Sequence, residues 1–151
     1  MARSNPRSVV AIAGHPLHPM LVSFPIVCFT LTLLTDIAYW RTSNLMWQHF
    51  SEWLLFAGLI IGGLAALAGV IDVIASKRIR SLKLVWFHAL GNVVVLGLAL
   101  VNSLVHAGDG WTAVVPWGLT LSAVTVAIML VTGWLGASMI YKHRVGVSHH
   151  E

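Results

Sequence analysis

The sequence has 151 residues, of which 58% are hydrophobic and only 9% are charged, with a formal charge of +4 at pH 7. Soluble domains carry about 25% charged residues, so this composition does not fit a soluble globular fold and predicts that lipid surrounds most of the surface. The basic residues flank the apolar runs, which indicates membrane topology and gives no reason to expect nucleic-acid binding.

The first feature in chain order is a pair of histidines, His15 and His18, each directly before a proline in the stretch GHPLHP. A residue before proline is restricted to extended or polyproline II backbone. We therefore expect residues 15–18 to form a polyproline II turn with both rings on one side. Pro19 should occupy the first position of the following helix, so that the two histidines form a rigid polar cap at the membrane interface.

Four apolar runs follow, and each is long enough to cross a bilayer, which takes about 20 helical residues. The predicted helices cover residues 19–40, 53–75, 84–106 and 113–140, and a polar cytoplasmic tail covers 141–151. The connections are too short to hold a soluble domain. The sequence therefore predicts a single all-α domain over residues 1–151, an integral membrane four-helix bundle.

The positions of lysine and arginine predict the orientation of this bundle. With four spans, one side of the membrane carries Arg3, Arg7, Lys77, Arg78, Arg80, Lys83, Lys142 and Arg144, and the other side carries only Arg41. Because cytoplasmic loops carry the excess of basic residues, both termini are predicted to face the cytoplasm. Tryptophans typical of a membrane interface gather at the opposite end, namely Trp40, Trp47, Trp53, Trp111 and Trp117.

Ionisable groups within the spans are costly and usually face the bundle interior. Asp72 lies near the end of the second predicted helix, and His88 lies at a similar depth near the start of the third. Both should approach His18 at the cytoplasmic end. One face of the third predicted helix carries His88, Asn92, Val95, Ala99, Asn102 and His106. These residues follow one another at intervals of three or four, which places them on the same side of a helix.

A second polar group is predicted at the outer end of the bundle. Asp36 lies near the end of the first predicted helix, and His106 ends the third. His49 and Asp109, in the loops of the same end, are further candidates for this group. We regard this outer cluster of Asp36 and His106 as secondary to the cytoplasmic one.

Several of these residues carry a resemblance to a known family. The segment HPLHPMLVSFPI, Asp36 in LLTDIAYW, Asp72 in GVIDV, and His88 with Asn92 in FHALGN resemble a bacterial family of predicted four-helix membrane proteins, catalogued as domain of unknown function twenty-two thirty-one. The resemblance covers nearly the whole chain. It implies four helices in the bacterial inner membrane and no established activity. Relatives are sometimes joined to Rieske iron–sulfur or cytochrome modules, which associates the family with electron transfer or haem.

The leading functional hypothesis is a metal ion or haem b at the cytoplasmic end. His88 is one candidate ligand, and His18 or His15 is another. Asp72 is a candidate ligand or a group that orients a histidine, and Asn92 would hydrogen-bond within the pocket. Imidazole suits iron, copper and zinc alike, so the residues do not select the metal. A covalent c-type haem is excluded because the sequence has no CxxCH.

Two alternatives stay open. In the first, the protein is a non-catalytic accessory or assembly subunit that needs no cofactor, and Asp72 pairs with His88. In the second, the two polar groups serve a proton or small-solute pathway. Nucleotide-binding and hydrolase motifs are missing from the sequence, so enzymatic activity stays undecided, with electron transfer as the candidate. The expected partner is the lipid bilayer, and a respiratory or redox membrane protein or a second copy of the chain are candidates.

Overall fold

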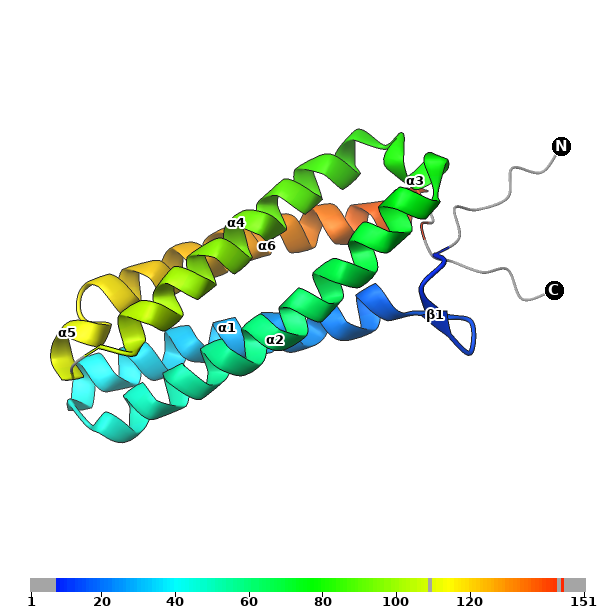
Figure 1. The fold of residues 1–151 in the computed structure, drawn as a ribbon. Helices are drawn as coiled ribbons and strands as arrows, with labels where there is room; N and C mark the ends of the chain where they lie inside the picture. Colours follow the sequence, from blue (N-terminus) through cyan, green and yellow to red (C-terminus); the bar gives the residue numbers. More distant parts are fainter. Residues whose placement is uncertain (1–7, 109, 144, 146–151) are drawn as a thin grey trace, which may run out of the picture.

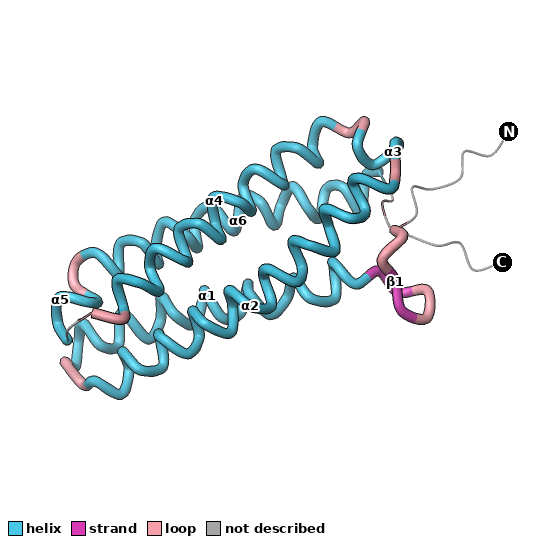
Figure 2. Tube along the Cα trace, viewed as in Figure 1, coloured by secondary structure: helices cyan, strands magenta, loops and turns pink. Residues whose placement is uncertain are grey.

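The computed structural model describes residues 8–108, 110–143 and 145, and most of these residues belong to four long helices. The long helices are α1 (Leu17–Thr42), α2 (Leu45–Ala75), α4 (Lys83–His106) and α6 (Trp117–His143). The short elements are β1 (Ala11–Ile12), β2 (His15–Pro16), α3 (Lys77–Arg80) and α5 (Gly110–Val114). The long helices run side by side as an elongated bundle, and short turns join them at its two ends (Figures 1 and 2). The predicted all-α four-helix architecture is confirmed.

The distribution of side chains is the reverse of that in a soluble bundle. Large apolar residues lie on the outside, and Leu104 and Trp134 are 69% and 73% exposed. Polar residues lie inside instead, among them Thr32, Asp36, Gln48, Ser51, Asn102, His106, Ser122, Thr125 and Thr132. All four helices are also long and apolar enough to cross a membrane. This arrangement suits hydrocarbon as the surrounding solvent, because hydrocarbon accepts apolar side chains and cannot hydrogen-bond polar ones.

Small residues let the helices approach each other closely. The buried face of α2 repeats every three or four residues and consists of Gln48, Ser51, Leu55, Gly58, Gly62, Ala65, Ala68 and Asp72. A Cβ on Gly58 would lie 2.5 Å from Cε1 of Phe29 on α1, so this position has no room for a side chain. The small residues on this face of α2 therefore form a close seam with α1, as is usual where lipid provides no hydrophobic drive between helices.

Two predicted helix starts are wrong. Helix α2 begins at Leu45, eight residues before the predicted start at 53, because the side chain of Asn44 caps it by accepting a hydrogen bond from the amide of Met46 at 3.0 Å. The first turns of α2 then place polar residues inside the bundle, where a loop had been predicted. Helix α6 begins at Trp117 instead of residue 113, and the residues just before it form the separate short helix α5.

The histidine–proline stretch forms a hairpin and not a polyproline II turn. Strands β1 and β2 pair antiparallel, with Ile12 opposite His15. The two residues between them, Ala13 and Gly14, have φ of 50° and 80°, and positive φ at both central residues is typical of a tight type I′ turn. Helix α1 then begins at Leu17. Pro19 is therefore its third residue and not its first, which is still within the turn whose amides lack acceptors.

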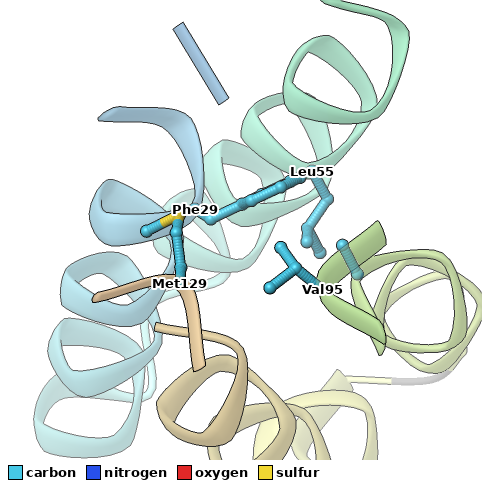
Figure 3. Packing of buried hydrophobic residues seen from close by; sticks show 5 residues of the cluster. Phe29, Leu55, Val95 and Met129 are labelled. Carbon is cyan, nitrogen blue, oxygen red and sulfur yellow. The ribbon is translucent and has the colours of Figure 1, made fainter. Parts of the chain in front are cut away.

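An apolar layer fills the middle of the bundle. It consists of Phe29, Leu55, Val95, Ala99 and Met129, and each of the four long helices contributes to it. Figure 3 shows Phe29, Leu55, Val95 and Met129 converging on one point. Along α1, this layer lies between His18 and Asp36, so the two polar clusters predicted from the sequence occupy opposite halves of the bundle.

The two ends of the bundle differ in chemistry. One end carries α3, the hairpin and the last turn of α6 (Figure 1), and we name it the basic end after Lys77, Arg78, Arg80, Lys83 and Lys142. The opposite end carries α5 and the turn between α1 and α2. We name it the aromatic end after Trp40, Trp47, Trp53, Trp111 and Trp117.

The seam between α1 and α2 can be tested with Gly58→Ala. The added methyl meets the buried Phe29 ring, so we expect the free energy of unfolding in detergent to fall by about 1–3 kcal/mol, as for other overpacked cores. Gly63→Ala is the matched control because a Cβ there has nothing within 4 Å. Equal stability of the two variants would contradict the packing described here.

Candidate functional site

His18 and His88 meet at the basic end, as the sequence predicted. His18 lies in the first turn of α1 and His88 in the second turn of α4. Their ring centroids are 5.9 Å apart and the ring planes are inclined by 84°. Both side chains are partly buried. The bundle therefore brings together two imidazoles from helices that are far apart in sequence.

Each imidazole is held by a backbone carbonyl of a neighbouring helix. Nδ1 of His18 lies 2.7 Å from the carbonyl oxygen of Ala65, and Nδ1 of His88 lies 2.9 Å from that of Thr132. A carbonyl oxygen only accepts hydrogen bonds, so Nδ1 must carry a proton in both rings. In the neutral form, each Nε2 is then left with a lone pair. The amide nitrogen of Asn92 lies 3.1 Å from Nε2 of His88 and also donates to the carbonyl of His88 at 2.8 Å.

Two glycines make room for these rings. A Cβ on Gly69 of α2 would lie 3.1 Å from Nδ1 of His18, and a Cβ on Gly136 of α6 would lie 3.1 Å from Cε1 of His88. Any other residue would crowd the imidazole at that position. We define His18 and His88 as the histidine pair. The ring of His18 packs against Gly69, and the ring of His88 packs against Gly136.

Asp72 does not join the histidine pair. Its carboxylate accepts hydrogen bonds from the hydroxyl of Ser8 at 2.6 Å and from the amides of Val9 and Val10 at 2.7 and 3.0 Å. Asp72 thus fastens the N-terminal hairpin to the end of α2. The suggested pairing of Asp72 with His88 is not found, since His88 bonds to Thr132 and Asn92.

His15 also lies apart from the histidine pair. It is on β2 of the hairpin and is exposed. Within the described ranges, no group of three or more His, Cys, Asp or Glu side chains is arranged as a metal site. The described geometry therefore reduces the predicted cytoplasmic constellation to two imidazoles and Asn92. Asp72, on α2, holds residues 8–10, and His15 lies on β2 of the hairpin.

The most buried polar cluster lies at the aromatic end. The carboxylate of Asp36 is 2.8 Å from Nε2 of His106, and both side chains are completely buried. Ser51 donates to one carboxylate oxygen and Ser122 to the other, each at 2.6 Å. These four residues come from α1, α4, α2 and α6 in turn, so one carboxylate connects all the long helices.

Further hydrogen bonds fix the ring of His106. Nδ1 of His106 donates to the carbonyl of Asn102 at 3.0 Å, and the side chain of Asn102 donates to Ser122 at 2.8 Å. With Nδ1 protonated, a single proton is shared between Nε2 of His106 and Asp36, so the pair carries no net charge wherever that proton resides. Neutrality lets the pair lie within hydrocarbon without an unpaired charge. We name Asp36, Ser51, Asn102, His106 and Ser122 the aromatic-end network.

The sequence reading missed two members of this region. Ser51 and Gln48 precede the helix predicted over 53–75, whereas both are buried on α2, and Gln48 donates to the carbonyl of His106 at 3.3 Å. The steps of three residues from Gln48 to Ser51 and of four from Ser51 to Leu55 were the available signal. His49 was a candidate for this cluster but lies on the outside of α2, 3.4 Å from Glu52. Asp109, another candidate, lies outside the described residues.

These features define a multi-pass membrane protein with polar clusters at both ends of a four-helix bundle. The chain belongs to the family described as "Predicted membrane protein (DUF2231)", whose model matches residues 14–149. The resemblance seen in the sequence motifs is thereby confirmed. No curated protein and no solved structure matches the chain.

The role of Asp72 can be tested by hydrogen exchange. Asp72→Ala removes the acceptor for the amides of Val9 and Val10, and hydrogen bonds to charged groups are among the stronger ones. We expect these two amides to exchange at least about tenfold faster than in the unmodified protein. Asp72→Asn keeps one acceptor oxygen and should give an intermediate rate. Unchanged exchange in Asp72→Ala would show that the carboxylate does not hold the hairpin.

The aromatic-end network can be tested with a double-mutant cycle. Asp36→Ala strands the buried donors of His106, Ser51 and Ser122, and we expect it to lower the free energy of unfolding by about 3–5 kcal/mol. Combined with His106→Ala, the loss should fall short of the sum of the single losses by at least about 1 kcal/mol. The exposed pair of His49 and Glu52 is the control and should show almost no coupling. Additive losses for Asp36 and His106 would disprove the pairing.

Proposed function

We propose that this protein binds a transition-metal ion or haem b through Nε2 of His18 and His88. The observation that carries the proposal is the anchoring of both Nδ1 atoms to backbone carbonyls. Histidines that ligate metals almost always donate their other ring N–H to such a partner, which fixes the tautomer and the ring orientation. The same anchoring leaves Nε2 of His18 as an available ligand, and Nε2 of His88 becomes one when it exchanges its hydrogen bond from Asn92 for the metal.

The separation of the rings is compatible with a shared ion. Two imidazoles bound to one ion at about 2.0–2.1 Å have ring centres roughly 5–6.5 Å apart. The observed distance of 5.9 Å falls within this range. Two histidines also suffice as the axial ligands of haem iron, whereas a metal ion needs further ligands, for which water is the candidate.

The location of the pair favours a role at the cytoplasmic side of a bacterial inner membrane. The pair lies at the basic end, and basic residues mark the cytoplasmic side of membrane proteins. Both termini would then lie in the cytoplasm. A haem or a redox-active metal at this depth suits electron exchange, so the proposed partners are a respiratory or redox membrane protein and, in an oligomer, further copies of the chain.

A second candidate function is that of an accessory or assembly subunit without a cofactor. It is favoured by the same hydrogen bonds, because His18 links α1 to α2 and His88 links α4 to α6. Such bonds stabilise membrane bundles by themselves. A continuous proton or solute pathway is less favoured, since the apolar layer around Phe29 and Met129 separates the two polar clusters.

The proposal is tested by purifying the protein in mild detergent from iron-replete cells and measuring its visible spectrum and metal content. We expect a Soret band or a bound metal at about one equivalent per chain, lost in His88→Gln and in His18→Gln because each removes one ligand. His49→Gln is the matched control, as it changes an exposed histidine at the other end, and it should keep full occupancy.

A colourless, metal-free protein would overturn the proposal, as would equal loss of occupancy in His49→Gln. Thermal unfolding of the same variants separates the two candidate functions. Lower stability in His18→Gln and His88→Gln, without any metal in the unmodified protein, would favour the accessory subunit.

A further inference from the structure

Three buried side-chain oxygens have no hydrogen-bond partner among the described residues, namely Oε1 of Gln48 on α2, Oδ1 of Asn102 on α4 and Oγ1 of Thr125 on α6. Asn102 and Thr125 lie on two helices that a hydrogen bond joins. The side chains are 1% and 2% exposed, respectively. A buried polar atom is almost always satisfied by protein or by ordered water, and one that has no protein partner points to a bound molecule.

The hydroxyl of Thr125 differs from those of other threonines in the bundle. Six described threonines return the hydroxyl hydrogen to a carbonyl three or four residues earlier, namely Thr30, Thr32, Thr35, Thr42, Thr120 and Thr132. This bond is the usual way for a threonine to satisfy its hydroxyl within hydrocarbon. Thr125 has no such bond, so its hydroxyl is available to a ligand inside the bundle.

Asn102 and Thr125 lie about one helical turn from each other along the bundle. The hydrogen bond of 2.8 Å between Asn102 and Ser122 sets α4 against α6 at this level. Thr125 follows Ser122 by three residues, so it lies on the same face of α6, about 4.5 Å further along the axis. Two atoms about 5 Å apart can be joined by one water molecule that makes a normal hydrogen bond to each.

We infer that Oδ1 of Asn102 and Oγ1 of Thr125 bind an ordered water molecule, which extends the aromatic-end network towards the apolar layer. Thr125 donates its hydroxyl hydrogen to the water, and the water donates to Asn102. Asn102 in turn donates to Ser122, and Ser122 donates to Asp36. Every donor in this chain points towards the carboxylate, and hydrogen bonds aligned in one direction strengthen one another.

Charge balance favours water over a cation as the ligand. The pair of Asp36 and His106 is already neutral with its one shared proton. A sodium ion beside Asn102 and Thr125 would therefore add a buried charge with no counter-charge, which is costly in a membrane interior. Water provides both a donor and an acceptor and adds no charge, and two partners are enough to hold a buried water molecule.

The sign of a stability change tests this inference. Thr125→Val keeps the shape of the side chain and removes its hydroxyl. If the hydroxyl holds water, the unfolding midpoint in detergent should fall by about 2–4 °C. If the hydroxyl is unpaired, its removal should raise the midpoint. Thr125→Ser keeps the hydroxyl and should retain water binding. Thr32→Val removes a hydroxyl that is already bonded to the carbonyl of Cys28, so it is the control for the loss of an ordinary hydrogen bond within a helix.

Radiolytic hydroxyl-radical footprinting gives a second readout, because a bound water molecule generates radicals inside the bundle. Met129 lies one turn from Thr125 and is only 6% exposed, and methionine is readily oxidised. We expect oxidation of Met129 in the unmodified protein and in Thr125→Ser, and at least about threefold less in Thr125→Val. A raised or unchanged midpoint, equal oxidation of Met129, or stabilisation by sodium but not by potassium would each overturn the inference.

Discussion

The structure depends on one constraint, which is that hydrocarbon offers no hydrogen-bond partner to a polar side chain. The carboxylate of Asp36 is completely buried and obtains all its hydrogen bonds from the protein. It accepts hydrogen bonds from His106, Ser51 and Ser122, and these residues belong to three other helices. The relative rotation of all the long helices is therefore fixed at one point, because turning any of them would expose a polar group to lipid.

The two polar clusters are built on different principles. The aromatic-end network is neutral, and each carboxylate oxygen of Asp36 is satisfied by the protein itself. In the histidine pair both Nδ1 atoms are bound to carbonyls, and Nε2 of His88 lies 3.1 Å from the amide nitrogen of Asn92. The apolar layer between them, with Leu55 and Val95 at its centre, keeps the clusters independent. The first cluster therefore joins all the long helices, whereas the second joins α1 to α2 and α4 to α6.

Much of the fold could be predicted because hydropathy and spacing act locally. The approach of His18 to His88 followed because both residues lie near the start of a helix at the basic end, and the polar face ending in His106 followed from steps of three and four residues. The partner of Asp72 could not be predicted, because three hydrogen bonds to residues 8–10 depend on a hairpin with positive φ at Ala13. Ser51 was missed since neighbouring polar residues resemble a loop until Asn44 is recognised as a helix cap.

The hydrogen bonds between residues 8–10 and Asp72 have a consequence for synthesis of the chain. Residues 8–10 leave the ribosome long before residue 72, and their acceptor does not exist until the end of the second helix has been made. The beginning of the chain must therefore wait, without its native contacts, while two spans enter the bilayer. The hydrogen bonds from residues 8–10 to Asp72 can form only after α1 and α2 have both been made. They can form before the third span, which contains His88, has been synthesised.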